Sequence, residues 1–242
     1  MNPVFPFAGR FDAAIVDLDG TLVDTLGDFV AALNLMLAEV LPGAPGAAAL
    51  DAAAVEPMVG KGSEHLVQSV LDHVRAQAAP GRGAIDSVAL YGAACASYQR
   101  HYAAVNGRHA ALYPGVHEGL RALQASSLKL VCLTNKPLAF ARTLLRAKGL
   151  DGYFREVFGG DSFARKKPDP LPLQKACEFL GTRPARTLMV GDSSNDARAA
   201  RAAGCPVLLV TYGYNHGAPV RAVDADGFVE SLAELAGLPG PR

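Results

Sequence analysis

The chain has 242 residues, of which 50% are hydrophobic and 19% are charged. This composition is typical of a globular protein with a substantial core, and it excludes an intrinsically disordered chain. The 23 basic and 23 acidic side chains balance, so the composition also excludes a nucleic-acid-binding protein that relies on a strong overall positive charge.

Several absences in the sequence bear on location and partners. The sequence contains no run of 18 apolar residues, and its first ten residues lack the apolar segment of a secretory signal. The four cysteines lie far apart, which fits neither a disulfide framework nor a thiolate zinc site. We therefore expect a cytoplasmic protein with no membrane partner. The sequence leaves the oligomeric state, monomer or homodimer, open.

The N-terminal part contains one predicted strand and then a long helical region. Residues 13–18 form a short apolar run that stops at Gly20, which is typical of a buried strand. Apolar residues then recur at helical spacing from Leu26 to Val40, and again over residues 66–74 and 88–102. Because no strand-like pattern occurs between about residues 26 and 110, we predict an all-helical segment there.

After about residue 110, predicted strands and helices alternate. The predicted strands are residues 128–133, 157–158, 187–190 and 207–210, and the predicted helices are residues 116–124, 138–148, 171–180 and 195–203. Such alternation with short links is typical of a parallel sheet that is covered by helices on both faces. We therefore predict an α/β protein with a Rossmann-like core, formed by residues 1–24 and 111–242, and an inserted helical domain at residues 25–110.

Polar residues stand at the carboxyl ends of three predicted strands. These residues are Asp17, Thr134 and Asp192. The carboxyl ends of parallel strands share one edge of the sheet, where ligands bind in open α/β folds. A carboxylate at the end of a buried strand is costly unless it is paired or coordinates a cation. We therefore expect the three residues to meet in one site.

The acidic residues of this predicted site suggest metal-assisted acid–base chemistry. Asp17 and Asp19 lie two positions apart, on roughly one side of an extended chain, and Gly20 permits a sharp turn after them. Two such acids suit a division between a nucleophile or metal ligand and a general acid or base. Asp192 and Asp196 add two carboxylates, and this all-oxygen set favours Mg²⁺ over zinc.

The acidic cluster would repel a phosphate unless cations offset its charge. Lys167 supplies one positive charge, and Thr134 and Asn135 can donate hydrogen bonds to phosphate oxygens at a strand–helix junction. Asp196 has an alternative interpretation as a capping residue of the helix that begins nearby.

A glycine-flanked lysine in the helical region is a second candidate site. Gly60 and Gly62 flank Lys61 just before a predicted helix. Backbone N–H groups in such a loop could hold a distal anionic group of a substrate. A simple turn between two helices explains the same residues.

Four motifs of the sequence resemble those of the haloacid dehalogenase superfamily of phosphotransferases, in the family's order. They are Asp17-Leu18-Asp19-Gly20-Thr21, then Thr134, then Lys167, and finally Gly191-Asp192-Ser193 with Asp196. The helical insert after the first motif is similar to the family's type-1 cap. Further stretches, among them Gly159-Gly160-Asp161 and residues 211–215, resemble the phosphoglycolate phosphatase branch of bacteria, although Lys61 stands where that branch often has asparagine.

The resemblance implies a Mg²⁺-dependent phosphatase whose partner is a small phosphate ester, with 2-phosphoglycolate preferred. It implies that Asp17 forms an aspartyl phosphate and that Asp19 is the general acid and base. The implied metal ligands are Asp17, the backbone carbonyl of Asp19, and Asp192; Lys167 and Thr134 would bind the phosphoryl group. Gly20, Thr21 and Asp196 would support the site.

The motifs leave other functions open. Sugar phosphatases, pyrophosphatases, nucleotidases and sugar phosphomutases share them. A catalytically idle domain that only binds a phosphate ligand is an alternative from a different functional class.

Overall fold

The computed structural model describes residues 11–42, 49–77 and 87–238. Within them, six parallel strands form one sheet in the order β5-β4-β1-β6-β7-β8. These strands are β1 (Ala13–Val16), β4 (Lys129–Leu133), β5 (Glu156–Phe158), β6 (Thr187–Gly191), β7 (Val207–Val210) and β8 (Gly227–Val229). The first strand thus lies in the middle of the sheet, between β4 and β6, with Ile15 in register with Val131 and Met189.

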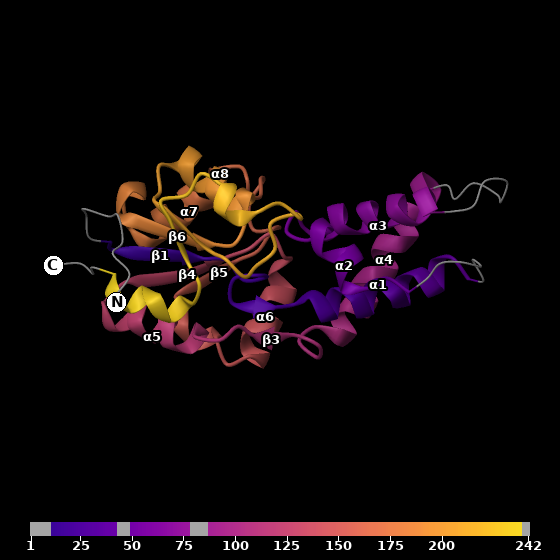
Figure 1. The fold of residues 1–242 in the computed structure, drawn as a ribbon, viewed down its shortest axis with the longest axis horizontal. Helices are drawn as coiled ribbons and strands as arrows, with labels where there is room; N and C mark the ends of the chain where they lie inside the picture. The colour runs from indigo at the N-terminus through magenta and orange to yellow at the C-terminus, as the bar shows by residue number, and fades with distance from the viewer. Residues whose placement is uncertain (1–10, 43–48, 78–86, 239–242) are drawn as a thin grey trace.

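Helices cover both faces of this sheet because successive residues of a strand point to opposite faces. Ala14 and Val16 of β1 pack with α5 (Val116–Ala125), α6 (Leu138–Ala147) and the 3₁₀ segment Leu232–Gly237. Ala13 and Ile15 pack with α7 (Leu171–Leu180) and α8 (Ser194–Ala203) on the other face. The predicted α/β class with a Rossmann-like parallel sheet is therefore confirmed (Figure 1).

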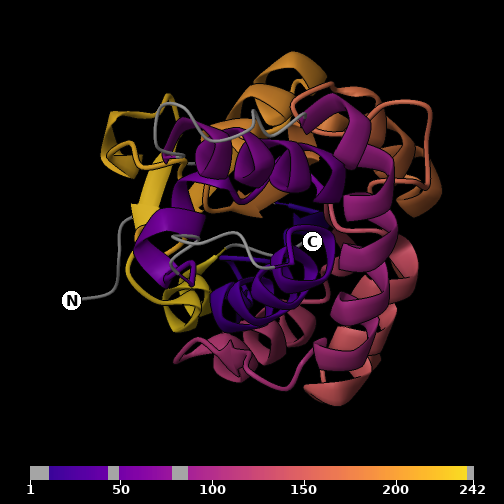
Figure 2. The same ribbon diagram turned by 90° about the vertical axis from the view of Figure 1, so that its right-hand side faces the viewer.

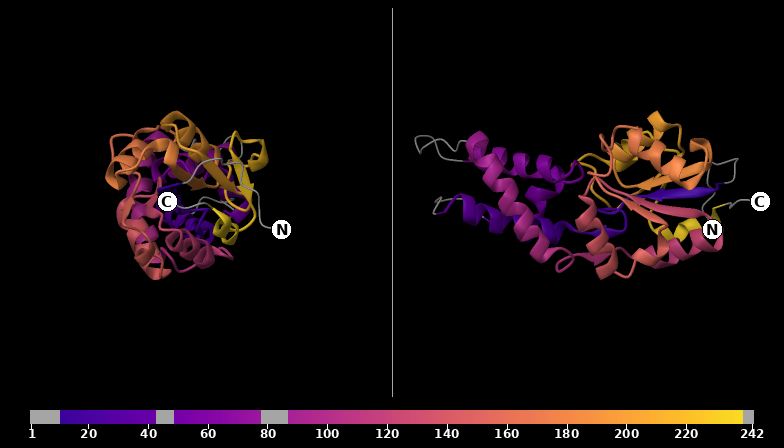
Figure 3. Two further views of the ribbon diagram at one scale, coloured as in Figure 1. Left: turned by 90° about the vertical axis from the view of Figure 1, so that its left-hand side faces the viewer. Right: turned by 180° about the vertical axis from the view of Figure 1, so that it is seen from behind.

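The helical region forms a second lobe beside the carboxyl edge of the sheet. It consists of α1 (Leu26–Val40), α2 (Ala52–Val55), a 3₁₀ turn (Glu56–Met58), α3 (Ser63–Gln77) and α4 (Ser87–Val105). These elements have their own apolar cluster, in which Tyr98 and Tyr102 are among the largest fully buried side chains. The helices face the viewer in Figure 2, and the view from behind in Figure 3 shows the two lobes side by side.

A short antiparallel ribbon lies where the chain passes between the two lobes. Its strands are β2 (Val23–Asp24) and β3 (Ala111–Leu112). The predicted domain boundaries, after residue 24 and before residue 111, fall within this ribbon. The division into two domains stays a prediction, and residues 1–10 and 239–242 of the predicted core lie outside the described residues.

The described helices include none that is long and apolar enough to span a membrane.

Candidate active site

Three strands of the sheet bring the predicted polar residues to one place. Asp17, Thr134 and Asp192 directly follow β1, β4 and β6, which are neighbours in the sheet. All three residues are buried and line one cavity, whose empty volume is about 500 Å³ including the part open to solvent. This convergence follows from the parallel topology, since strand ends of one polarity share one edge.

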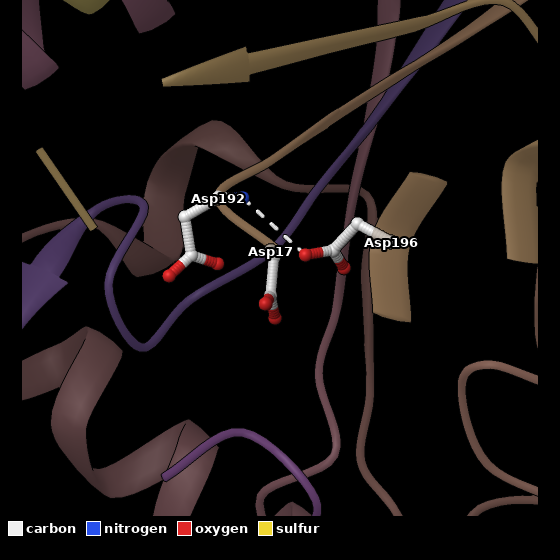
Figure 4. A group of neighbouring side chains, drawn as sticks. All are labelled: Asp17, Asp192 and Asp196. Atoms are coloured by element: carbon white, nitrogen blue, oxygen red, sulfur yellow. Dashed lines mark hydrogen bonds between the residues drawn. The ribbon is translucent and has the colours of Figure 1, made fainter. Parts of the chain in front are cut away.

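Three carboxylates gather around the end of β1, as Figure 4 shows. Asp17 and Asp192 extend in the same direction, and the carboxylate of Asp196 points toward them from the side. One oxygen from each of the three carboxylates lies within 4.8 Å of the others.

Lys167 lies between two of these acids. Its Nζ lies 3.0 Å from Oδ1 of Asp17 and 2.7 Å from Oδ1 of Asp196, and it donates to the carbonyl oxygen of Leu133 at 2.9 Å. The Lys167 side chain is only 2% exposed. Although burial alone lowers the pKa of Lys167, the charges of Asp17 and Asp196 raise it above its ordinary value. Lys167 is therefore a permanently charged ammonium group beside Asp17.

Burial and mutual repulsion change the titration of the acids. Burial is the main cause that raises the pKa of Asp17; Lys167 lowers it, the charge of Asp196 raises it, and the net value is about 7. Burial also raises the pKa of Asp192 well above its ordinary value, and the neighbouring Asp196 and Asp17 add to this shift. The protein alone therefore does not compensate the charge of the fully ionised cluster.

The donor set and the sparse hydrogen bonding of its carboxylates fit a divalent metal ion. Oδ1 of Asp17 is buried, and its side-chain partner is the ammonium group of Lys167 at 3.0 Å. The oxygens of Asp192 have only partial hydrogen bonding, from the Tyr214 amide at 2.6 Å and the Thr21 hydroxyl at 3.3 Å. Buried carboxylate oxygens in this state are typical ligands of a hard cation. The site can therefore hold a metal.

Gly20 and Thr21 shape the loop that follows Asp19. Gly20 has a φ of +82°, and a side chain there would collide with the carboxylate of Asp192. A residue without Cβ is thus required at this position for two reasons, conformation and space. Thr21 is fully buried and orients Asp192 through its hydroxyl group.

Asp196 combines the two roles that the sequence left open. Its Oδ2 accepts hydrogen bonds from the amide and hydroxyl groups of Ser193, at 3.1 and 2.8 Å, which closes a capping box at the start of α8. Its Oδ1 binds Lys167. Helix capping therefore fixes the carboxylate that holds the lysine.

Asp19 lines the same cavity but is not part of the cluster of three acids. Its Oδ1 accepts hydrogen bonds from the Thr25 hydroxyl and from Nζ of Lys136, both at 2.8 Å. Lys136 also donates to the hydroxyl of Tyr102 at 2.6 Å, and its Nζ lies 4.8 Å from the ring centroid of Phe29. The side chain of Lys136 is 2% exposed.

Sequence reasoning assigned no role to Lys136. Most lysine side chains are exposed in folded proteins, so residue type alone did not distinguish Lys136. The available signal was its place: it follows Thr134 and Asn135, at the end of the strand that neighbours β1.

The loop at Gly60 contacts the strand ends through two asparagines. Nδ2 of Asn135 and Nδ2 of Asn195 donate to the Gly60 carbonyl at 3.0 and 3.2 Å. Asn135 also donates to the Lys167 carbonyl at 2.8 Å, so its side-chain amide is occupied by the protein itself. Gly60 lines the cavity, whereas Lys61 is not among the described residues that do. Substrate contacts of Asn135 and Lys61 stay predictions.

The rest of the cavity wall is mostly apolar and comes from the helical lobe. It includes Phe29 of α1, Val59, Leu66 of α3 and Tyr98 of α4. Tyr214, from the loop after β7, completes the wall, so part of the segment 211–215 lies at the site. The cavity therefore has a polar floor on the sheet and an apolar roof on the helices.

Comparison with known proteins agrees with this architecture. Residues 11–204 match the family of haloacid dehalogenase-like hydrolases. The chain is 44% identical over 225 residues to a phosphoglycolate phosphatase of Thiobacillus denitrificans, a match that covers 93% of each chain. It is 44% identical over 229 residues to a plasmid-encoded phosphoglycolate phosphatase of Cupriavidus necator, covering 95% of this chain and 93% of the relative.

A solved structure supports the same relationship. The crystal structure of a predicted phosphoglycolate phosphatase from Haemophilus somnus superimposes with a TM-score of 0.85 at 32% identity, and covers 95% of this chain and 98% of its own. The resemblance inferred from the four motifs is confirmed, as is the expectation of an enzyme. The chain belongs to the haloacid dehalogenase-like hydrolases.

Proposed function

We propose that this enzyme hydrolyses small phosphate monoesters through an aspartyl phosphate on Asp17. The observation that carries the proposal is the position of this carboxylate: it is buried, lines the cavity beside the other acids of the cluster, and has the ammonium group of Lys167 at 3.0 Å. A carboxylate that lines a cavity beside a fixed cation is suited to attack phosphorus.

In the first half of the reaction, an Asp17 carboxylate oxygen forms a bond to phosphorus while the ester P–O bond breaks. Lys167 offsets charge on the transferring phosphoryl group, and the Thr134 hydroxyl donates a hydrogen bond to it. Asp19, which faces the helical side of the cavity, gives its proton to the departing alkoxide, and the alcohol is released.

In the second half, a water molecule attacks the aspartyl phosphate. Asp19, now ionised, takes a proton from this water as its oxygen bonds to phosphorus. The bond between phosphorus and the Asp17 oxygen breaks, which regenerates the carboxylate and releases inorganic phosphate. The apolar roof of the cavity limits access of further water during both steps.

We propose Mg²⁺ as the metal, held by Asp17, Asp192 and the backbone carbonyl of Asp19. When bound, the ion supplies positive charge that stabilises the phosphoryl group in the transition state. The all-oxygen donor set and the uncompensated carboxylate charge support this assignment. Gly20, Thr21 and Asp196 keep the ligands in place.

We propose 2-phosphoglycolate as the preferred substrate. The support is the name shared by the relatives at 44% identity over more than nine-tenths of the chain, and the modest size of the cavity. We also propose that residues 25–110 act as a cap that sets substrate preference, with Gly60 contributing to the binding wall. Oligomeric state and cellular location stay predictions.

The test is phosphate release from a panel of esters in the presence of Mg²⁺. The panel holds 2-phosphoglycolate, glucose phosphates, pyrophosphate and nucleoside monophosphates, with a sample treated with EDTA as control. The highest kcat/KM on 2-phosphoglycolate, lost in EDTA, is the expected result. A higher value on a sugar phosphate, pyrophosphate or a nucleotide would replace the substrate but keep the chemistry.

Two other outcomes would replace the chemistry itself. Interconversion of sugar phosphates without net phosphate release would identify a mutase. Binding of phosphate esters without turnover, by folded protein with Mg²⁺, would identify a domain that only binds such ligands.

A further inference from the structure

Lys136 is a buried cation that the phosphoryl-transfer chemistry leaves without an assigned role. Among the described residues that line the cavity, it is the one with a cationic side chain. Lys167, the other lysine of the site, already has two carboxylate partners and a carbonyl partner. A negatively charged group of a substrate, other than its phosphate, therefore has one cationic partner available on this wall.

The surroundings of Lys136 fix its ammonium group in place. Its Nζ donates to Asp19 and to Tyr102, at 2.8 and 2.6 Å, and lies 4.7 and 4.8 Å from the ring centroids of Tyr102 and Phe29. These contacts hold the charge in a low-dielectric region, where an ion pair with a ligand is stronger than in water. Two bonds occupy two of the three N–H donors of an ammonium group.

Bond lengths limit which phosphate esters can place a carboxylate near the ammonium group of Lys136. The ester oxygen must lie within hydrogen-bond reach of Asp19 when the alcohol leaves. Lys136 contacts Asp19 directly. In an ester of a 2-hydroxy acid the carboxylate carbon is two bonds from the ester oxygen, so its oxygens lie within about 4 Å of that oxygen. A carboxylate on such a substrate is thus within reach of Nζ of Lys136.

We infer that Lys136 is a specificity-determining residue that binds the carboxylate of phosphate esters of 2-hydroxy acids. The inference rests on the proposed function and extends it from one substrate to a chemical class. The cavity is also lined by Phe29, Leu66 and Tyr98, and sugar hydroxyl groups placed against these side chains would lose hydrogen bonds to water. Phosphoglycolate and phospholactate both fit this description.

The experiment compares two esters that differ in the carboxylate alone. In ethyl phosphate a methyl group replaces the carboxylate of 2-phosphoglycolate, so the ratio of their kcat/KM values measures carboxylate recognition. We expect Lys136→Met to lower this ratio about 10- to 100-fold, because a hydrogen bond to a charged group is lost. Any effect through Asp19 acts on both esters and cancels in the ratio.

Two control variants separate this role from general damage. Lys175→Met removes an exposed lysine of α7 that pairs only with the exposed Glu178 among the described residues, and its ratio should equal that of the wild type. Tyr102→Phe removes one partner of Lys136 but keeps its charge, so the ratio should fall less than in Lys136→Met. Circular dichroism and thermal unfolding establish that each variant is folded.

A binding measurement provides a readout that does not depend on turnover. In the Asp17→Asn background, calorimetric titration with 2-phosphoglycolate should give a dissociation constant about 10- to 100-fold higher after Lys136→Met, while that of ethyl phosphate changes less. An equal change for both ligands, or no change for either, would overturn the inference.

The same data distinguish failure of the inference from failure of the proposed function. An enzyme that prefers another carboxylated ester, with a ratio that depends on Lys136, would reject 2-phosphoglycolate but keep the inference. An enzyme that prefers 2-phosphoglycolate with an unchanged ratio in Lys136→Met would keep the function and reject the role of Lys136.

Discussion

The two buried lysines at the edge of the sheet have equal exposure but different neighbours. The side chains of Lys167 and Lys136 are each 2% exposed, and each contacts an aspartate of the first motif. All partners of Lys167 come from the α/β lobe: Asp17, Asp196 and the Leu133 carbonyl. Lys136 contacts Asp19 and also Tyr102 and Phe29 of the helical lobe.

This difference separates two tasks within one site. The surroundings of Lys167 stay the same wherever the helical lobe lies, so they suit a step common to all phosphate esters. The contacts of Lys136 with Tyr102 and Phe29 exist only while the helices cover the sheet edge, so they suit recognition of what distinguishes one ester from another. We therefore expect variants around Lys167 to affect all phosphate esters alike, and variants around Lys136 to affect some esters more than others.

The largest effect is expected from Asp17→Asn. The amide cannot form the aspartyl phosphate, so kcat on 2-phosphoglycolate and on ethyl phosphate should both fall by about 10⁴-fold or more. Steady-state phosphate release by the folded variant measures this loss. If kcat with either ester stayed within about tenfold of the wild-type value, Asp17 would not be the nucleophile. The step that we propose for all phosphate esters would then be wrong.

Lys167→Met should cause the largest loss of stability. Removing this ammonium group leaves Asp17 and Asp196 facing each other in a buried site, and breaking a buried ion pair in this way costs about 3–5 kcal/mol. Lys136→Met should cost less, because Asp19 is partly exposed and keeps its hydrogen bond from Thr25. Urea unfolding without metal compares the two free energies of unfolding, and equal losses would contradict the distinction between the lysines.

The next prediction concerns pH and the metal. The pKa of Asp17 is raised to about 7, from an ordinary carboxyl value of about 4. Between these values the folded chain keeps a proton that the unfolded chain has released, so the stability contributed by protonated Asp17 is lost as pH rises through this window. Without metal, Asp17→Asn should therefore be more stable than the wild type above pH 7, by about 2–4 kcal/mol, and similar to it near pH 4.

Magnesium provides the control for this pH effect. A bound divalent cation favours ionised Asp17, so Mg²⁺ should stabilise the wild type more at pH 8 than at pH 5 and should do little for Asp17→Asn. Thermal unfolding in EDTA and in excess Mg²⁺ measures both differences. If the difference in stability between the wild type and Asp17→Asn did not change from pH 4 to pH 8, the predicted titration of Asp17 would be wrong.

The sequence predicted the fold well where hydrophobic patterns are long. Helices α1 and α3 follow a period of 3.6 over many residues, and strands such as β1 and β7 are continuous apolar runs that end at glycine or polar residues. β8 (Gly227–Val229) and the ribbon of β2 and β3 were not predicted, because their two or three residues form no apolar run that stands out from the neighbouring loops. These elements form because neighbouring strands offer hydrogen-bond partners, which is tertiary information.

The candidate site shows the same limit. Parallel topology places residues that follow adjacent strands together, so the meeting of Asp17, Thr134 and Asp192 could be predicted from strand ends alone. The contact between Lys136 and Tyr102 could not, because it depends on how the helical lobe packs on the sheet edge. A contact between residues of two lobes produces no pattern in the sequence around either residue.

The smallest predicted effect tests the contact between the lobes at Gly60. Asn195→Ala removes a 3.2 Å hydrogen bond from α8 to the Gly60 carbonyl, while Asn135 still binds the same oxygen. We expect a stability loss of about 1 kcal/mol and a two- to fivefold rise in KM, as about 1 kcal/mol of contact is lost. KM should rise equally for 2-phosphoglycolate and ethyl phosphate. The hydrogen bond between Asn195 and Gly60 positions the cavity wall and contacts neither the carboxylate of one ester nor the methyl group of the other.

Asn34→Ala is the matched control for Asn195→Ala. Asn34 also binds backbone groups through its amide, but both bonds go to Leu50 within the helical lobe. Its loss should lower stability by a similar or larger amount and leave KM unchanged for both esters. If Asn34→Ala raised KM as much as Asn195→Ala, the kinetic effect would reflect softening of the helical lobe itself. Substrate affinity would then depend on the rigidity of the helices, and the contact across the sheet edge would have no separate part in it.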